Sequence, residues 1–495
     1  MKLTNSNKVR TRFAPSPTGY MHVGNLRTAL YAWLLARKNN GTFILRIEDT
    51  DQERLVEGAA DIIFTTLAET GLTHDEGPDM GGDFGPYVQS ERRAAGIYKK
   101  YAQELIEKGS AYRCFCTKER LDELRVSCES KKLQTKYDGL CAHLSKEEIE
   151  KNLEDGVPYV VRLKMPQDGT STFNDEVFGE ISIENSTLED LILIKSDGYP
   201  TYNFANVVDD HLMEITHVVR GSEYIISTPK YNMIYDAFGW KRPAYVHVSP
   251  VMRDAQKKLS KRDGDASYRD FIDKGCLKEA LINYIALLGW NAGDDREKFT
   301  MEELIEAFDI KGISKSPAIF DEVKLRWLNS EYLREMTTEQ FKEKAMPFIQ
   351  KVVKRDIDVD ILIGGLHKRT EFLEDIPPQI DFIEELPQYD AELYRNKKMK
   401  TNPENSLEAL NELVPLLEVC NEWDHELLFL KIVEFSEKTG VNKKKYLWSL
   451  RVALSGKKMT PGGGTDIAAM LGKEETLSRI NKGIEILKIY GEKNE

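Results

Sequence analysis

The sequence predicts an α/β fold with a parallel sheet, interrupted by an inserted domain and followed by an all-α C-terminal half. Strand-like and helix-like segments alternate over the first hundred residues, and the alternation resumes after about residue 207. A strand–helix–strand order favours parallel strands joined by right-handed crossovers. Beyond about residue 270, apolar residues recur at helical spacing instead. We therefore expect four regions: residues 1–97 with 207–252, 98–206, 253–338, and 339–495 with a break near 400.

The individual elements follow from local patterns along the chain. Apolar or alternating runs predict strands at residues 9–14, 42–49, 215–223 and 244–250, and amphipathic runs predict helices from about residue 26 to 38, at 58–71 and at 228–239. The region that interrupts them has charged helical segments and strand-like runs at 159–163 and 190–196. In the C-terminal half, helices are predicted at 277–290, 300–308, 339–353 and 428–440.

The composition excludes several classes of protein. No apolar run reaches the roughly 20 residues that a membrane span needs, and the N-terminus MKLTNSNKVRTR has no secretory signal. Six cysteines in 495 residues fit reduced thiols in the cytoplasm better than a disulfide framework. The net charge of −13 argues against indiscriminate binding of nucleic acid, although local basic patches leave room for a specific polyanion.

A rigid turn connects the first predicted strand to the first predicted helix. Residues 15–25 read PSPTGYMHVGN, with His22 and Gly24 at the mouth of the helix and Asn25 as its expected cap. Exposed N–H groups and the helix dipole attract phosphate at such a position. The prolines restrict the loop before any ligand binds, so the segment fits a preorganised oxyanion site. A capped strand–helix turn with a surface histidine fits the pattern equally well.

A second phosphate-binding signal lies more than two hundred residues away. The loop KKLSKRDGDAS, residues 257–267, directly follows the predicted strand at 244–250 and contains Lys258, Ser260 and Lys261. Two lysines three residues apart suit a polyphosphate leaving group because each is a mobile point charge. Neither segment matches the dinucleotide fingerprint or the Walker loop, so another phosphate chemistry is indicated.

Together the two segments resemble the HIGH and KMSKS signatures of class I aminoacyl-tRNA synthetases, here as HVGN (22–25) and KLSKR (258–262). The departures at Asn25, Leu259 and Arg262 are forms that the glutamyl and glutaminyl branch tolerates. Longer phrases resemble the glutamyl-tRNA synthetase family, at residues 12–30, 43–51, 85–93, 199–224 and 245–264. The resemblance is strong over residues 9–290 and looser beyond.

This resemblance gives each predicted region a function. It implies a Rossmann-like catalytic domain at 1–97 and 207–252, an inserted tRNA acceptor-binding domain at 98–206, and a stem-contact helical domain at 253–338 that carries the KLSKR loop. The bacterial-type family ends in a helical anticodon-binding region, here 339–495. The implied reaction is glutamate–tRNA ligation: ATP activates L-glutamate to glutamyl-adenylate, and the glutamyl group passes to the 3′ end of tRNA(Glu). Positioning and charge stabilisation should dominate such catalysis.

The resemblance also assigns residues to ATP and to glutamate. Its catalytic residues are His22, Lys258 and Lys261; its ATP-binding residues are His22, Gly24, Asn25, Glu223, Met252, Lys258, Ser260 and Lys261, with Mg²⁺ accompanying ATP. Its glutamate-binding residues are Arg12, Ala14, Ser16, Glu48, Tyr202, Asn206 and Arg220. Arginine suits a carboxylate because its planar fork binds at two points. Which arginine meets which carboxylate stays open, and each arginine alternatively forms a structural ion pair.

The inserted region carries four metal-ligating side chains in two pairs. Cys114 and Cys116 (CFC) are followed by Cys141 and His143 (CAH). Two pairs of nitrogen or sulfur ligands fit a tetrahedral zinc site, and buried thiols are the alternative. Some bacterial members of the family hold zinc with this arrangement, so the resemblance implies structural Zn²⁺.

A basic and aromatic segment near the C-terminus fits single-stranded RNA. Residues 443–463 provide Lys443, Lys444, Trp448 and Arg451. Cations suit phosphates and an aromatic ring suits an unstacked base, although Trp448 alternatively belongs to the core. This segment is the expected tRNA-binding site of the helical half.

We expect a cytoplasmic, monomeric ligase that binds tRNA(Glu), L-glutamate and ATP and no membrane. The alternatives are a non-discriminating enzyme that also charges tRNA(Gln), a tRNA-modifying glutamyl transferase paralogue, and a non-catalytic RNA-binding module. Paralogues that modify tRNA lack a helical C-terminal half, which this chain has. The intact His22, Lys258 and Lys261 argue against a module without catalysis.

Overall fold

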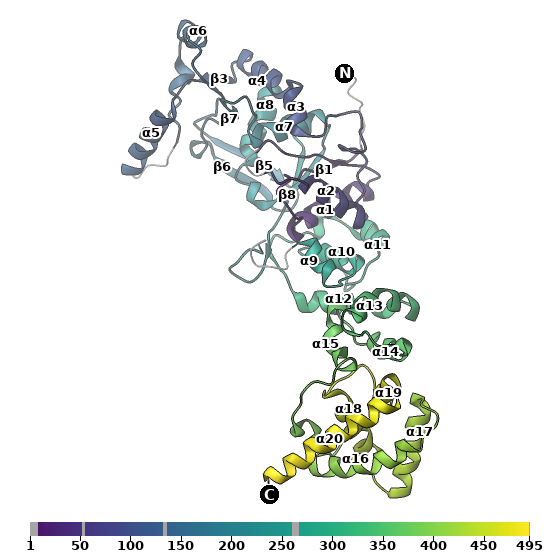
Figure 1. Ribbon diagram of the computed structural model, residues 1–495. Helices are drawn as coiled ribbons and strands as arrows, with labels where there is room; N and C mark the ends of the chain where they lie inside the picture. Colours follow the sequence, from purple (N-terminus) through teal and green to yellow (C-terminus); the bar gives the residue numbers. More distant parts are fainter. Residues whose placement is uncertain (1–7, 52–54, 132–135, 260–266, 495) are drawn as a thin grey trace. The chain divides into compact units, whose positions relative to one another are not determined.

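The computed structural model describes residues 8–51, 55–131, 136–259 and 267–494 (Figure 1), which divide into two units. The first unit comprises the described part of residues 1–271 together with residues 281–321, and the second comprises residues 272–280 with 322–495. The predicted class, an α/β part with a parallel sheet followed by an all-α half, is confirmed. The finer division into four regions stays a prediction.

Parallel strands form the centre of the first unit. The strands are β1 (Arg10–Phe13), β2 (Thr42–Leu45), β3 (Ala111–Cys114), β4 (Val160–Leu163), β5 (Thr170–Asp175), β6 (Gly179–Glu184), β7 (Ile192–Ile194), β8 (His217–Gly221), β9 (Ala244–Val248), β10 (Val251–Met252) and β11 (Ala318–Ile319). β1 pairs with β2 in parallel, and β8 pairs with β9 in parallel. The Thr216 backbone N–H donates to the Arg10 carbonyl at 3.0 Å and so places β1 beside β8.

A hairpin that the sequence patterns did not predict extends this sheet. β5 and β6 are antiparallel, and the end of β5 joins β9 through the parallel pair of Asp175 and Tyr245. The sheet order is therefore β6-β5-β9-β8. Residues of the interrupting region thus contribute directly to the sheet that carries the second predicted motif.

The first unit also contains helices. They are α1 (Val23–Lys38), α2 (Ala59–Glu69), α3 (Gln89–Ala94), α4 (Ile97–Glu107), α5 (Lys118–Ser130), α6 (Lys146–Glu154), α7 (Tyr202–Leu212), α8 (Thr228–Phe238) and α11 (Met301–Ala307). α9 (Tyr268–Asp273) and α10 (Lys278–Leu287) contain residues of both units. Figure 1 shows α1 and α2 on one side of the strands and α7 and α8 on the other.

Helix α1 is held in place by its wide apolar face. Leu26, Leu30 and Leu34 are completely buried against the sheet. The Tyr31 hydroxyl donates to the Leu288 carbonyl at 3.0 Å and so ties α1 to the end of α10. This packing fixes the N-terminus of α1, where the predicted phosphate-binding turn lies.

A separate antiparallel sheet, β3-β4-β7, carries the cysteine pairs and packs on α4, α7 and α8. Leu163, Leu193 and Phe204 are almost completely buried in this core. Beyond the sheet, α5 and α6 bury none of their side chains, and Figure 1 shows them projecting from the rest of the unit.

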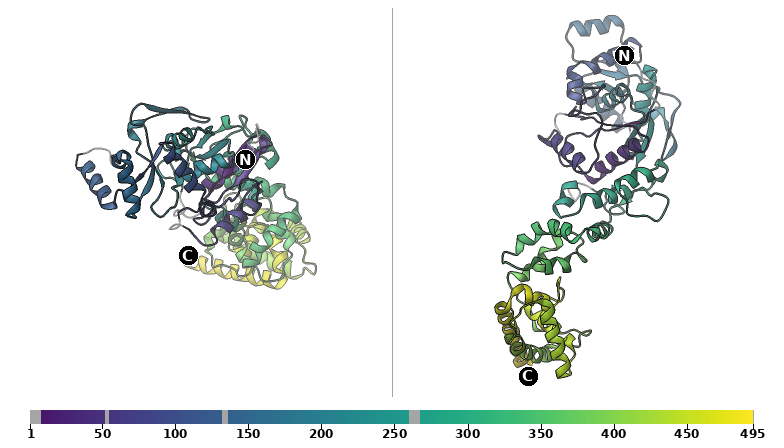
Figure 2. Two further views of the ribbon diagram at one scale, coloured as in Figure 1. Left: turned by 90° about the horizontal axis from the view of Figure 1, so that it is seen from above. Right: turned by 90° about the vertical axis from the view of Figure 1, so that its right-hand side faces the viewer.

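The second unit is helical. Its helices are α12 (Glu322–Glu335), α13 (Thr338–Val352), α14 (Val359–Leu366), α15 (Pro377–Ile380), α16 (Pro403–Glu418), α17 (His425–Thr439), α18 (Lys443–Ser455), α19 (Gly464–Leu471) and α20 (Lys473–Asn494). Both views of Figure 2 show the green-to-yellow C-terminal helices packed around one another. Among the described residues of the whole chain, no helix is both long and apolar enough to cross a membrane.

One buried arginine joins several segments of this helical unit. The Arg479 side chain, 1% exposed on α20, donates to the carbonyls of Phe382 at 2.6 Å, Leu454 at 2.8 Å and Ile383 at 3.2 Å. It also contacts Glu475 at 2.6 Å, one helical turn earlier. Charged hydrogen bonds of this kind are the stronger ones in proteins.

We predict that Arg479→Ala lowers the free energy of unfolding by about 3 kcal/mol, because it leaves buried carbonyls without donors. Lys482→Ala, on an exposed position of the same helix, is the matched control and should change stability by less than about 0.5 kcal/mol. Urea titration of both variants measures the difference. Equal stabilities would show that water replaces the arginine without cost.

Candidate active site

A cleft of about 360 Å³ lies at the carboxyl ends of β1 and β8 in the first unit. Ligands of open α/β sheets characteristically bind at this end of the strands. The sequence-predicted residues that line the cleft are Arg12, Ala14, Ser16, His22, Gly24, Asn25, Glu48, Tyr202, Arg220, Glu223 and Lys258. The structure therefore brings both predicted motifs to one cavity.

Two of the predicted residues that the structure describes, Asn206 and Met252, do not belong to this lining. Asn206 is buried and donates to the Tyr202 carbonyl at 2.7 Å, so it stabilises the first turn of α7 beneath the cleft. Met252 lies on β10, in a bridge with Lys258. Ser260 and Lys261 lie outside the described residues.

His22, and not Asn25, caps helix α1. The helix begins at Val23, three residues before the predicted start, and the His22 Nδ1 accepts a hydrogen bond from the Gly24 backbone N–H at 3.0 Å. The expectation that Asn25 caps the helix is therefore wrong, because the imidazole already satisfies one of the N–H groups at this end. With Nδ1 accepting, the proton of a neutral imidazole resides on Nε2, which makes His22 a hydrogen-bond donor.

Backbone contacts bring the lysine-bearing segment to this turn. Lys258 bridges to Met252, and Ser267, at the other end of the loop, bridges to His22. The Lys258 Nζ lies 4.0 Å from a Glu223 carboxylate oxygen, with both side chains more than half exposed. The Lys258 side chain thus lines the same cleft as the N-terminus of α1.

A buried network of charges supports the opposite wall. Arg12 contacts both carboxylate oxygens of Asp210, at 3.0 and 3.3 Å. Arg46, completely buried, binds Asp210 at 2.8 Å and Glu48 at 3.0 Å. Asp209 extends the network, since it accepts from Arg92 at 2.6 Å. Removing one partner from such a network typically costs about 3–5 kcal/mol.

The network controls the protonation of its members. Burial opposes ionisation of Asp210, but Arg12 and Arg46 outweigh it and lower the pKa of this carboxyl. Burial dominates at Glu48 and raises its pKa to about 6, despite the neighbouring Arg46 and Arg12. Glu48 is thus an anion at neutral pH and a neutral acid in mildly acidic solution.

Sequence reasoning missed the residues behind the cleft arginines. Asp210 and Arg46 support Arg12, whereas His247 and Asp175 lie behind Arg220. Asp210 and Arg46 lie inside the segments 199–224 and 43–51 that resemble the family, and their charge in otherwise apolar segments was the available signal. For Asp175 no such signal existed, because the β5–β6 hairpin was not predicted.

Three predicted metal ligands come together at the end of β3, where Cys114 ends the strand, Cys116 follows it and Cys141 lies in the short helix Leu140–His143. The thiols of Cys114, Cys116 and Cys141 lie within 4.8 Å of one another, with 3.5 Å between those of Cys116 and Cys141. Zn–S bonds of about 2.3 Å in a tetrahedron separate sulfurs by about 3.8 Å, so the spacing fits a metal ion. His143 is exposed and is not part of this group. The Tyr137 hydroxyl instead contacts Cys114 at 3.3 Å and Cys116 at 3.5 Å.

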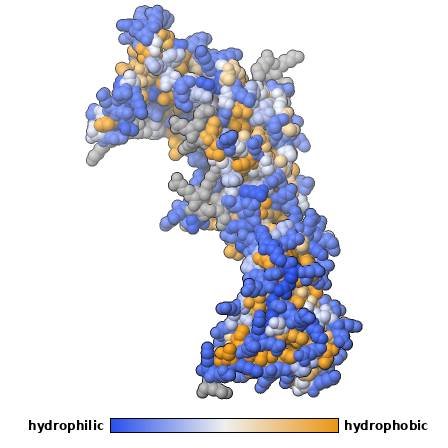
Figure 3. Space-filling view, in the orientation of Figure 1, coloured by the Kyte–Doolittle hydropathy of each residue, from blue (hydrophilic) through white to orange (hydrophobic). Residues whose placement is uncertain are grey.

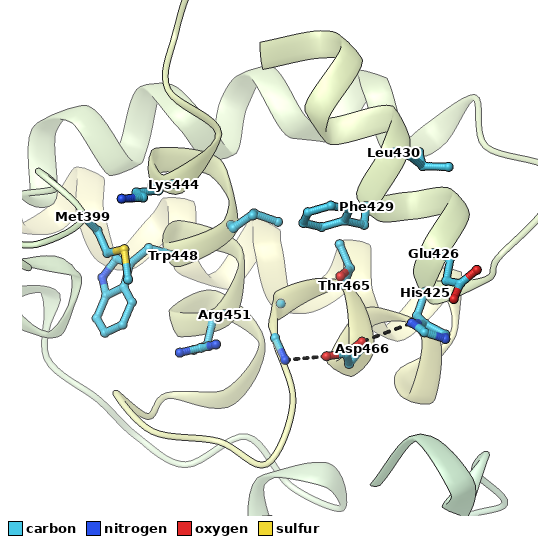
Figure 4. A pocket seen from close by; sticks show the side chains of 13 residues that line it. Met399, His425, Glu426, Phe429, Leu430, Lys444, Trp448, Arg451, Thr465 and Asp466 are labelled. Carbon is cyan, nitrogen blue, oxygen red and sulfur yellow. Dashed lines mark hydrogen bonds and ion pairs between the residues drawn. The ribbon is translucent and has the colours of Figure 1, made fainter. Parts of the chain in front are cut away.

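A second pocket, of about 600 Å³, lies among α17, α18 and α19 in the helical unit. Figure 4 shows Lys444, Trp448 and Arg451 of α18 on one side, and Phe429 of α17 on the other. Asp466 closes one end, where it lies 3.3 Å from the His425 Nδ1 and accepts from the Gly463 N–H at 2.6 Å. The space-filling view shows apolar side chains at the surface of the helical unit (Figure 3). The pocket therefore combines cations with apolar and aromatic walls.

Trp448 is a buried residue that also lines this pocket. Its side chain is 6% exposed, and its indole N–H donates to the Tyr394 carbonyl at 3.0 Å, as expected of a core residue. It nevertheless lines the pocket beside Lys444 and Arg451. Lys443, the other predicted residue of this segment, is not part of the lining.

Comparisons with known proteins cover almost the whole chain. Residues 8–327 match the model of the catalytic domain of class I tRNA synthetases (E and Q), and residues 331–484 match that of an anticodon binding domain. Glutamate–tRNA ligases of Clostridium tetani and Clostridium botulinum are 60% and 59% identical to the chain. Each alignment spans 98% of this chain, and 99% and 100% of those proteins.

Solved structures agree with these matches. A crystal structure of a glutamate tRNA ligase from Elizabethkingia meningosepticum, in complex with its amino acid, has a TM-score of 0.86 and 37% identity. The crystal structure of a glutamate–tRNA synthetase from Elizabethkingia anophelis has a TM-score of 0.87 and 36% sequence identity. Both similarities cover 97% of this chain and 100% of the other.

Proposed function

Because the chain belongs to the glutamate–tRNA ligase family of class I tRNA synthetases, we propose that it activates L-glutamate with ATP and transfers the glutamyl group to tRNA(Glu). The observation that carries this proposal is the shared cleft of His22, Lys258, Arg12 and Arg220. It combines donors for a triphosphate with cations for an amino acid that has two carboxylates. We also propose a cytoplasmic location and a monomeric state for the enzyme.

ATP binds at the N-terminus of α1. Its phosphates accept hydrogen bonds from the His22 Nε2–H and from the backbone near Gly24, where the helix dipole favours negative charge. Lys258 and Lys261 stabilise charge on the pyrophosphate as the glutamate α-carboxylate attacks the α-phosphate. Mg²⁺ accompanies the triphosphate and neutralises part of its charge.

Glutamate binds at the wall opposite the lysines. Its ammonium group faces the Glu48 carboxylate, and its carboxylates face Arg12 and Arg220, which are both 5% exposed. Tyr202, Ala14 and Ser16 complete the pocket. A buried arginine left without a carboxylate is unfavourable, so glutamine, with its neutral amide, is rejected.

The remaining proposals concern tRNA and the metal. Lys443, Lys444, Trp448 and Arg451 contact the anticodon region, which the cations and aromatic ring of the second pocket support. Cys114, Cys116 and Cys141 bind structural Zn²⁺ in the acceptor-binding insertion, with the fourth ligand supplied by the nearby Tyr137 hydroxyl or by His143. Such a closed site stabilises its fold.

Charging assays with separated tRNAs test the function. We expect the enzyme to charge tRNA(Glu) with glutamate, and to exchange pyrophosphate into ATP with glutamate only when tRNA is present. Equal charging of tRNA(Gln) would identify a non-discriminating enzyme. Failure to charge any tRNA, together with normal tRNA binding, would contradict the ligase assignment and favour a non-catalytic module.

The raised pKa of Glu48 predicts a pH dependence of glutamate use. The carboxylate that binds the ammonium group is lost as pH falls through about 6, so kcat/KM for glutamate should fall up to about tenfold per unit below that pH. The substrate's own carboxyl groups remain ionised above about pH 5. Glu48→Gln should have a low kcat/KM without this titration. A wild-type profile that is flat down to pH 5 would remove Glu48 from the ammonium site.

Metal analysis tests the thiol site. The purified protein should contain about one Zn²⁺ per chain, and Cys116→Ser should lose it while Cys128→Ser, at a thiol outside the cluster, should retain it. We expect zinc removal to lower the melting temperature and raise KM for tRNA, with KM for glutamate unchanged. Equal zinc content in both variants would contradict the site.

A further inference from the structure

A buried histidine lies directly behind Arg220. The Arg220 Nε donates to the His247 Nε2 at 3.1 Å, and the His247 Nδ1 lies 2.6 Å from a carboxylate oxygen of Asp175. The side chains of His247 and Asp175 are completely buried. Since the carboxylate accepts at Nδ1 and the guanidinium donates at Nε2, only the neutral Nδ1–H tautomer satisfies both contacts.

Asp175 is fixed more firmly than a surface carboxylate. One oxygen accepts from the backbone N–H groups of Val177 at 3.0 Å and Phe178 at 2.9 Å, and the other also accepts from the backbone of His247 at 3.2 Å. Burial opposes its ionisation, but the His247 and backbone hydrogen bonds outweigh it and lower its pKa. Burial also lowers the pKa of His247, in keeping with a neutral ring.

The orientation of Arg220 is fixed by its surroundings. Besides the contact with His247, its Nη2 donates to the Thr228 hydroxyl at 2.8 Å. The guanidinium carbon lies 4.5 Å from the ring centre of Tyr231, 5.3 Å from that of Tyr224 and 5.4 Å from that of Tyr245. Arg220 also lines the cleft, so its remaining guanidinium N–H groups are available to a ligand bound there.

The two cleft arginines differ in how their charge is balanced. Arg12 forms a double contact with the Asp210 carboxylate, whereas no carboxylate lies within ion-pair distance of Arg220 among the described residues. A neutral imidazole orients a guanidinium without cancelling its charge. A carboxylate in the same place would compete with an anionic ligand.

We propose that His247 and Asp175 are positioning residues, which hold Arg220 as an oriented cation, in direct contact with no carboxylate of the described chain, for the side-chain carboxylate of glutamate. The inference rests on the proposed function and deepens it, because it makes preference for a carboxylate over an amide depend on a buried pair outside the cleft lining. Asp175 fixes the tautomer of His247, and His247 fixes the plane of Arg220.

Two substitutions at His247 separate orientation from packing. His247→Asn keeps a donor near Asp175 but removes the acceptor for Arg220, whereas His247→Gln places an amide oxygen near the former Nε2. With saturating ATP and tRNA(Glu), His247→Asn should raise KM for glutamate about 10- to 100-fold and change KM for ATP by less than about twofold. His247→Gln should bring KM for glutamate most of the way back to the wild-type value. His217→Asn, on the neighbouring strand β8 and outside the cleft lining, is the control and should match the wild type.

Asp175→Asn tests the tautomer independently. The amide presents a donor to Nδ1 and favours the Nε2–H tautomer, whose proton would face the Arg220 Nε–H. We expect a similar rise in KM for glutamate and at least a tenfold smaller preference for glutamate over glutamine in kcat/KM. A parallel rise of both KM values, or a loss confined to kcat, would overturn the positioning role.

A measurement on the unaltered enzyme covers the case in which these variants fail to fold. The chain has eight histidines, so ¹⁵N-histidine NMR of the full-length protein, assigned by the missing signal of His247→Gln or by contacts to Tyr245, reports the tautomer directly. A neutral Nδ1–H ring is the expected result, and an Nε2–H or charged ring would overturn the proposal. If the wild type does not charge glutamate at all, the proposed function fails; if it does and the variants behave normally, only this inference fails.

Discussion

The ion pair between Arg12 and Asp210 joins strand β1 to helix α7, and the shape of the cleft depends on it. Both side chains are at most 5% exposed, so each charge would be strongly destabilising without the other. Arg46 adds a second cation to the same carboxylate and also holds Glu48. The charges of β1, of the segment after β2 and of α7 therefore balance only when these three segments lie together. Their arrangement forms one wall of the cleft.

This balance explains why the two cleft arginines are not equivalent. Arg12 is bound by a carboxylate of its own chain, so it contributes mainly shape and hydrogen bonds to a ligand. Arg220 is oriented by His247 and by aromatic rings, and these partners leave its charge intact. Under the proposed function, a ligand carboxylate therefore gains more from Arg220, because the carboxylate behind it, Asp175, contacts His247 and not the guanidinium itself. The proposed selectivity for an acid over an amide therefore rests mainly on the arginine that has no direct carboxylate partner among the described residues.

The sequence predicted the features that depend on local residue patterns, and it missed those that depend on the order of strands in the sheet. The turn at residues 15–25 and the ends of β8 and β9 could be recognised because motif residues stand next to apolar runs. The capping role of His22 could not, since it depends on the side-chain rotamer. Asp175 is 72 residues from His247, and its alternating segment gave no indication that β5 joins β9. The buried partners of the cleft arginines thus required tertiary structure, while the arginines themselves did not.

His22, which lines the cleft, and His247, which lies behind Arg220, show how the same side chain serves as a donor in one place and an acceptor in another. At His22, the Gly24 N–H donates to Nδ1, which leaves the proton on Nε2 and makes the ring a donor for an anion. At His247, Asp175 holds the proton on Nδ1, which makes Nε2 an acceptor for a cation. Each tautomer is set by the neighbour that contacts Nδ1. Whether the Nε2 of each histidine donates or accepts therefore depends on the group that contacts its Nδ1, and the sequence alone does not identify that group.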